Sequence, residues 1–278
     1  MAATIVRSEL SALNEQPWID AGVNLFAAQF DADRSDVLSR ATAAGVQAVL
    51  LIGSDIAESQ ANIDYIAQQQ SQPTLFTTAG VHPHQAGAVA AEWLEQLRQC
   101  FSHDSVVAVG ECGLDFNRMF SPMAAQIEVF TAQLELSKQL KKPVYLHERD
   151  AFDTQISLLK NQHIHHGIAH CFTGNSEQLS AYLAQGLYIG ITGWLCDERR
   201  GQDLQAALAY LPLDRLILET DAPYLLPRNL ANKPKSRRNE PAFIAAIAEE
   251  VARLKQCSVA DVAAASMHNV QQLLHGGS

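Results

Sequence analysis

Histidine and carboxylate residues recur in this chain directly after short apolar segments. Glu111 follows the apolar residues 106–110, and His147, His170 and Asp221 follow three similar segments. A buried segment gains nothing from an ionised carboxylate unless that charge is paired, hydrogen-bonded or bound to a metal ion. Imidazole nitrogens and carboxylate oxygens gathered at one point are typical ligands of a divalent cation. These four residues are therefore predicted to form a metal-binding cluster.

Further polar residues end neighbouring apolar segments and are expected to face the same point: Asp20, His82, His84 and Glu219. Each has a structural alternative, because a histidine can cap a turn and a carboxylate can accept hydrogen bonds from loop amides. Asp115 and Glu148 are candidates for orienting the ligand imidazoles, with ordinary helix capping as the alternative.

Eight short apolar segments alternate with predicted helices along the chain. The predicted strands are residues 18–25, 46–53, 75–81, 106–110, 143–146, 167–169, 187–191 and 215–218. Eight strand–helix units in one chain predict an α/β protein with a closed (β/α)8 TIM barrel rather than an open sheet. In such a barrel the carboxyl ends of all strands meet at one mouth, which would bring the polar residues together.

No glycine-, serine- or proline-rich linker interrupts this alternation, so residues 18–278 are predicted to form a single catalytic domain. Residues 1–17 are polar and lack an apolar core segment. They are expected to be a loosely ordered extension rather than a secretory signal. The longest segment without periodicity, residues 222–240, is expected to form a functional loop over the barrel mouth.

Composition describes an ordinary soluble globular protein, with 47% hydrophobic and 18% charged residues. No apolar stretch is long enough to predict a membrane span. The net charge of −10 argues mildly against a nucleic-acid binder, although a local basic patch is enough to hold a polyanion. Five cysteines without a CxxC pair argue against disulfides and indicate a reducing cytoplasm. We expect a monomer.

Several segments, in this order, resemble motifs of the TatD family of metal-dependent nucleases: residues 80–84, 109–115, 143–147, 170–174 and 219–225. Further stretches resemble the branch for which the family is named rather than its paralogues: residues 19–25, 116–118, 190–200 and 237–241. The resemblance implies a TIM barrel similar to the metal-dependent amidohydrolases. It also implies 3′–5′ removal of nucleotides from single-stranded DNA or RNA, with roles in DNA repair or DNA degradation.

The resemblance further implies a divalent cation as cofactor, with Mg²⁺ expected and Mn²⁺ or Zn²⁺ as alternatives. Most family members carry a His-x-His pair on the first strand, where this chain has Gly22 and Asn24. We therefore expect the side of the centre formed by Glu111 and its neighbours to hold metal. The side near Asp20 and Asn24 is expected to be weaker, or filled only when a substrate phosphate adds oxygen ligands.

On this hypothesis Glu111 and Asp221 are both metal ligands and catalytic groups, and Asp221 orients or deprotonates the attacking water. His82 would contact a phosphate or protonate the departing oxygen. Arginines expected to bind the phosphate backbone are Arg118, Arg149, Arg199, Arg237 and Arg238. Aromatic residues that could stack on bases are Phe116, Trp194 and Tyr224.

Two other functions compete with the nuclease hypothesis. One is an amidohydrolase or lactonase acting on a small substrate, which predicts a lysine carbamate between two metals. No predicted strand ends in lysine, and the nearest lysines, Lys141 and Lys142, precede a strand. The other is a catalytically silent scaffold, supported by the missing His-x-His pair.

Overall fold

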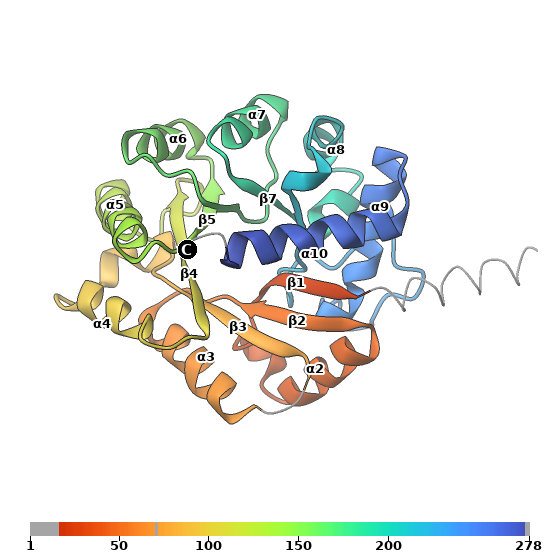
Figure 1. Ribbon diagram of the computed structural model, residues 1–278, viewed down its shortest axis with the longest axis horizontal. Coiled ribbons are helices and arrows are strands. Elements are labelled where there is room, and N and C mark those ends of the chain that lie inside the picture. Colours follow the sequence, from red (N-terminus) through yellow and green to blue (C-terminus); the bar gives the residue numbers. More distant parts are fainter. Residues whose placement is uncertain (1–16, 70–71, 276–278) are drawn as a thin grey trace, which may run out of the picture.

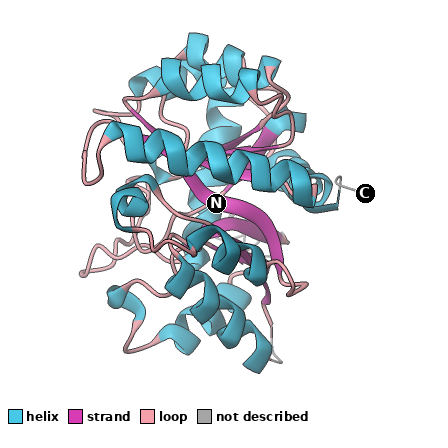
Figure 2. Cartoon of the chain, turned by 90° about the vertical axis from the view of Figure 1, so that its left-hand side faces the viewer, coloured by secondary structure: helices cyan, strands magenta, loops and turns pink. Residues whose placement is uncertain are grey.

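Eight parallel strands lie side by side in sequence order, and helices surround them on the outside (Figures 1 and 2). The computed structural model describes residues 17–69 and 72–275. The predicted loosely ordered extension, residues 1–17, lies outside the described residues except for Pro17. Within the described residues, no helix is both long and apolar enough to cross a membrane.

The strands are β1 Trp18–Val23, β2 Val46–Leu51, β3 Thr74–Ala79, β4 Val106–Asp115, β5 Val144–Arg149, β6 Gly167–Ala169, β7 Tyr188–Ile191 and β8 Leu216–Leu218. The α-helices are α2 Arg34–Ala43, α3 Ile56–Gln68, α4 Trp93–Cys100, α5 Met123–Leu140, α6 Phe152–Asn161, α7 Ser176–Ala184, α8 Gln202–Leu208, α9 Ile244–Lys255 and α10 Val259–His275. Short 3₁₀ helices are η1 Ala28–Phe30, η2 Pro83–Ala88, η3 Gly193–Cys196, η4 Leu213–Arg215 and η5 Pro241–Phe243.

Backbone contacts just beyond β8 close the ring onto β1. Val23 and Ala222 form a parallel bridge. The backbone N–H of Asp221 donates to the carbonyl of Gly22 at 2.9 Å, and that of Asn24 donates to Ala222 at 2.8 Å. The predicted (β/α)8 barrel is therefore confirmed. The carboxyl ends of its parallel strands face a common mouth.

The central strand β4 is longer than the sequence indicates. All ten of its residues are buried, and it continues through Glu111 as far as Asp115. The prediction that Glu111 ends this strand is therefore wrong. Gly110 and Gly113 adopt φ angles of +144° and +142°, which residues with a side chain rarely accept. The pairing of β4 with β5 shifts its register between Val109 and Cys112, so the strand bends there and then resumes.

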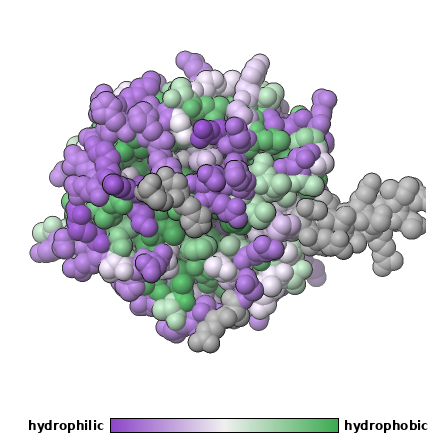
Figure 3. Space-filling view, in the orientation of Figure 1, coloured by the Kyte–Doolittle hydropathy of each residue, from purple (hydrophilic) through white to green (hydrophobic). Residues whose placement is uncertain are grey.

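Helix α10 covers the end of the barrel opposite the mouth, where it crosses the centre of the view in Figure 1. The Asn269 side chain donates to the carbonyls of Leu213 and Leu216, and Val270 and Leu273 join the hydrophobic cluster that includes Ile217. Figure 3 shows this face, on which hydrophilic and hydrophobic residues are interspersed. The opposite end is thus left for the chemistry.

Removing the apolar contact of α10 should weaken the barrel. Leu273 is 1% exposed, so Leu273→Ala should lower the free energy of unfolding by about 2 to 5 kcal/mol through lost burial and a cavity. Urea denaturation measures this change. Gln272→Ala, at the exposed neighbouring position, is the matched control and should cost less than about 0.5 kcal/mol. Equal costs for the two variants would contradict this role of α10.

Candidate active site

A cavity of about 570 Å³ opens at the barrel mouth, where the strands end. Its lining includes all four residues predicted to form the metal-binding cluster, together with His82, His84 and Asp115. The side chains that the sequence separates by up to 139 positions (from His82 to Asp221) therefore share one cavity.

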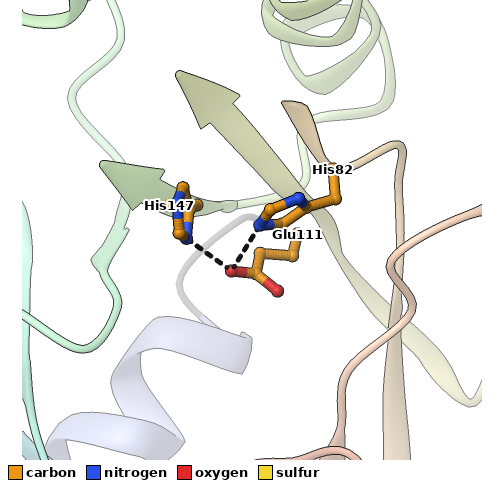
Figure 4. Close-up of side chains that lie close together, drawn as sticks. All are labelled: His82, Glu111 and His147. Carbon is orange, nitrogen blue, oxygen red and sulfur yellow. Dashed lines mark hydrogen bonds and ion pairs between the residues drawn. The ribbon is translucent and has the colours of Figure 1, made fainter. Parts of the chain in front are cut away.

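Glu111 lies at the centre of a first group of possible metal ligands, with His82 and His147 on either side (Figure 4). The Glu111 Oε1 atom lies 3.0 Å from His147 Nδ1 and 3.6 Å from His82 Nε2. On the far side of His147, Nε2 lies 3.4 Å from Asp115 Oδ2. Asp115 also contacts His84 Nε2 at 2.7 Å. Two carboxylates therefore fix the ring of His147.

A second group of possible ligands consists of His170, Cys171 and Asp221. The His170 Nε2 atom faces two carboxylates, since it lies 3.9 Å from Glu111 Oε1 and 3.9 Å from Asp221 Oδ1. Its other nitrogen, Nδ1, lies 2.8 Å from Glu219 Oε2. A carboxylate on one imidazole nitrogen sets the tautomer and leaves the other nitrogen for a metal ion.

Tyr145 also fixes the position of His170. Its hydroxyl lies 2.6 Å from His170 Nδ1, 2.8 Å from Glu219 Oε2 and 3.0 Å from the carbonyl of Ala21. Glu219 also accepts a hydrogen bond from the backbone N–H of Cys171. Both Tyr145 and Glu219 are fully buried, so the orientation of His170 is fixed by the core of the barrel.

The carboxylates around the two histidines decide their charge. Burial alone would lower the pKa of His170, but the negative charge of Glu219 and its hydrogen bond raise it to about 10. Burial likewise opposes protonation of His147, and hydrogen bonds to Asp115 and Glu111 raise its pKa to about 9. Without a metal ion, both imidazoles are therefore protonated on both nitrogens and positively charged at neutral pH.

Glu111 and Asp221 respond in opposite directions to the same surroundings. Burial would raise the pKa of Glu111, yet His82, His147 and His170 together hold it well below its usual range. Burial raises the pKa of Asp221 to about 7, although the charge of His170 acts against this. Glu111 is thus a permanent anion, while Asp221 can exchange a proton near neutral pH.

His82 differs from the other two imidazoles. Its Nδ1 atom accepts a hydrogen bond from the backbone N–H of His84 at 3.1 Å, and burial lowers its pKa to about 3. Neutral His82 therefore carries its proton on Nε2, the nitrogen that faces Glu111. The ring is arranged to donate a hydrogen bond into the cavity.

The chemistry of these donors fits a divalent cation. Among the described residues, no lysine or arginine forms an ion pair with Glu111 or Asp221. Carboxylates whose only cationic neighbours are imidazoles, with ligand atoms within 4.8 Å of one another in each group, are suited to a metal ion. Cys171 is a poorer donor, because burial raises the pKa of its thiol well above the usual range.

The first strand explains why an imidazole is absent at Gly22. A Cβ atom there would overlap the hydroxyl of Tyr145 and lie 3.0 Å from Glu219 Oε2. Asn24 instead donates from Nδ2 to Asp221 Oδ1 at 2.8 Å. The expectation that Asp20 faces the mouth is wrong, because its carboxylate is fully buried and accepts hydrogen bonds from Thr220. Asp20 therefore joins β1 to the end of β8.

The predicted phosphate-binding arginines do not all lie at the mouth. Arg118 and Arg149 line the cavity beside the histidines. Arg199 lines a separate cavity. Arg238 is held by Asp33 at 2.8 Å and by Glu240 at 2.7 Å. Arg237 is exposed on the loop after β8.

Aromatic side chains at the rim also differ from expectation. Tyr224 lines the cavity and is 48% exposed, while Trp194 lines it behind Arg149. Phe116 packs against the hydrophobic core instead. Phe120 lines the cavity and is 67% exposed. Sequence reasoning missed Phe120, because nothing in the sequence distinguishes an exposed aromatic from a buried one.

Several supporting residues were only partly foreseen from the sequence. Asp115 contacts two imidazoles, whereas Glu148 accepts a hydrogen bond from the backbone N–H of Ala151, just before helix α6, at 2.8 Å. Sequence reasoning gave Glu219 no role of its own and did not single out Tyr145. The signal for Glu219 was its place two residues before Asp221 at the same strand end. Tyr145 gave no signal, because it lies within an apolar strand.

A TIM barrel with an imidazole–carboxylate cluster at the carboxyl ends of its strands has the architecture of a barrel hydrolase. The sequence matches the family described as TatD related DNase over residues 19–275. The chain therefore belongs to the TatD family.

Individual relatives agree with this assignment. The 3′-5′ ssDNA/RNA exonuclease TatD of Rahnella sp. (strain Y9602) is 50% identical over 236 residues, covering 84% of this chain and 89% of that protein. A TatD family hydrolase of Entamoeba histolytica superposes with a TM-score of 0.86 at 26% identity, over 94% of this chain and 98% of that one. The TatD homologue of Escherichia coli K12 gives 0.84 at 28% identity, over 92% and 97%.

The contact between Gly22 and Tyr145 predicts strong coupling between two substitutions. Gly22→Ala should lower the free energy of unfolding by about 1 to 3 kcal/mol, because the added methyl group meets the tyrosine hydroxyl. In a Tyr145→Phe background most of that cost should vanish. Guanidinium denaturation of both single variants and the double variant measures the coupling.

Tyr182→Phe is the matched control, because Tyr182 is equally buried but lies in another part of the core. Its effect should add to that of Gly22→Ala within about 0.5 kcal/mol. If Tyr145→Phe were equally additive, the hydroxyl would not be what excludes a side chain at position 22.

Proposed function

We propose that this protein is a metal-dependent 3′–5′ exonuclease that hydrolyses phosphodiester bonds of single-stranded DNA and RNA. The observation that carries the proposal is His170, which is fixed by Glu219 on one nitrogen and faces Glu111 and Asp221 with the other. The name of the Rahnella relative, which is 50% identical, supports the same substrate class and polarity. As ligands we propose Glu111, His147, His170 and Asp221, with Mg²⁺ as the ion.

A bound divalent cation would withdraw charge from the scissile phosphate and lower the pKa of a nearby water molecule. Asp221 is placed to orient that water and accept its proton, because its carboxylate lines the cavity and burial raises its pKa to about 7. Glu111 holds negative charge at the centre of the ligand set. His82 donates from Nε2 to a phosphate oxygen; with a pKa of about 3 its ring is neutral at pH 7 and has no imidazolium proton to transfer to the leaving oxygen.

We propose that Arg118 and Arg149 bind substrate phosphates at the mouth. Both line the cavity that holds the histidines, and a guanidinium group matches phosphate oxygens in pairs. The exposed rings of Phe120 and Tyr224 offer stacking surfaces that accept any base. This combination suits a strand bound without sequence preference.

We further propose a cytoplasmic monomer that acts in DNA repair or DNA degradation. All five cysteines are free thiols, which suits a reducing compartment. The amidohydrolase alternative gains no support from the site, because no lysine lines the cavity in the described part of the chain. The two groups of possible metal ligands argue against a catalytically silent scaffold.

Loss of a central ligand should abolish turnover without unfolding the protein. Glu111→Ala and His147→Ala are expected to lower Mg²⁺-dependent release of nucleotides from a 3′-labelled single strand by at least about 100-fold. Circular dichroism checks that the barrel remains folded. His163→Ala, in a loop away from the mouth cavity, is the matched control and should retain activity. Full activity in either ligand variant would remove this mechanism.

Metal binding should release protons. His147 and His170, with pKa values of about 9 and 10, are protonated at neutral pH, and an imidazole must lose a proton to bind a cation. The affinity for Mn²⁺ should therefore rise as the pH increases from 6 to 9, with about one to two protons released per ion.

Isothermal titration calorimetry in buffers of different ionisation enthalpy measures the number of protons released. The His170→Gln variant should release about one proton fewer than the parent protein. An affinity that does not change between pH 6 and pH 9 would show that the ion does not displace protons from these imidazoles.

A further inference from the structure

The segment between β8 and η5 has a charge unlike the rest of the chain. Residues 222–239 contain five basic residues and no aspartate or glutamate, although the whole chain has a net charge of −10. The basic residues are Arg228, Lys233, Lys235, Arg237 and Arg238. We call residues 222–239 the basic loop.

The basic loop is anchored at several points. Arg238 binds Asp33, and the Asn239 side chain donates to the carbonyl of Thr220 at 2.9 Å. Nearer its start, Asn229 donates to the carbonyl of Ala246 at 2.7 Å. These contacts use Arg238 for structure and fix both ends of the segment that carries the other cations. Anchored ends lower the entropic cost of ordering such a segment on binding.

Three of those cations are exposed and uncompensated. Lys233, Lys235 and Arg237 are exposed and form no ion pair with any described residue. Since acidic residues outnumber basic ones in the chain by 30 to 20, three unpaired cations on one short segment mark a surface for an anionic partner.

A second cavity of about 750 Å³ lies against this loop, outside the mouth. Arg199, Arg228 and Lys233 contribute to its wall. Two acids in the same wall are already neutralised. Asp197 pairs with Arg200 at 2.7 Å and Arg228 at 3.0 Å, and Glu250 pairs with Arg253 at 2.6 Å. Arg199 and Lys233 thus keep their charge for a ligand, and Glu198 is the one acid of this wall outside those pairs.

The mouth and the second cavity are neighbours along two segments of the chain. Trp194 lines the mouth and Cys196 the second cavity; likewise Leu225 lines the mouth and Arg228 the second cavity. Three residues span at most about 11 Å even when fully extended. A single nucleic-acid strand a few nucleotides long is sufficient to reach from one cavity to the other.

The other groove beside the mouth does not suit a phosphate backbone. It has a volume of about 710 Å³ and shares Glu148, Arg149, Thr173 and Trp194 with the mouth. Its lining includes five acids and two arginines: Glu148, Asp150, Asp153, Glu177, Asp203, Arg149 and Arg200. Repulsion from the acids directs a polyanion to the side of the basic loop.

We propose that the basic loop and Arg199 form a binding site for the phosphate backbone of the substrate strand on the 5′ side of the scissile bond. This rests on the proposed function, because an enzyme that removes nucleotides from the 3′ end holds the rest of the strand on the 5′ side. The site recognises phosphates, which every sequence shares, and so adds affinity without selecting bases.

The test uses the full chain with Lys233→Glu, Lys235→Glu and Arg237→Glu combined. The ratio of kcat/KM on a 20-nucleotide strand to kcat/KM on a dinucleotide without a 5′ phosphate should fall at least about tenfold, because the dinucleotide has no phosphate on the 5′ side of the scissile bond to bind the basic loop. Binding of the 20-nucleotide strand is measured separately by fluorescence anisotropy in a Glu111→Ala background. There the slope of log Kd against log salt should decrease by about 2, since each phosphate contact on a single strand contributes about 0.7.

The matched control reverses three lysines near the amino-terminal ends of the strands: Lys141, Lys142 and Lys160. It has the same change in net charge and should keep both the ratio and the salt slope of the parent. Equal effects of the two triple variants, or an unchanged ratio and slope in the loop variant, would overturn the proposal. A parent protein that binds the strand but releases no nucleotide with any divalent ion would instead refute the proposed function alone.

Discussion

Buried negative charge at the mouth of the barrel is the constraint on which the site depends. Glu111, Asp221 and Glu219 lie within 3.9 Å of one imidazole, that of His170; Glu111 and Glu219 are buried, and the side chain of Asp221 is only 16% exposed. Such charges are stable only when cations or strong donors oppose them. The described structure supplies imidazoles rather than lysine or arginine, so a metal ion would satisfy an arrangement that the fold has already built.

The same constraint accounts for the unusual first strand. The space beside Gly22 is filled by the hydroxyl of Tyr145 and the carboxylate of Glu219, which act on His170 from behind. An imidazole on β1 and a tyrosine on β5 cannot occupy this volume together. Tyr145 and Glu219 thus fix the His170 side of the site, while Asn24 binds Asp221 on the other side.

Charge is divided over the surface in a way that the net value hides. A chain of net charge −10 still presents arginines in the mouth and an acid-free loop beside it, whereas the groove on the other flank is acidic. A polyanionic strand is therefore attracted to one part of the rim and repelled from another. This asymmetry, rather than overall composition, decides whether the protein is able to hold nucleic acid.

The sequence by itself determined the barrel and most of the cluster, because strand period and polar strand ends are local patterns. It predicted that Glu111, His147, His170 and Asp221 gather, and the structure places all four in one cavity. Only the tertiary structure decided their partners. That Arg238 is tied to Asp33, that Asp20 is buried and that Tyr145 supports His170 depend on contacts between residues 25 to 205 positions apart. No local pattern encodes such contacts, because they arise from how the ring of strands closes.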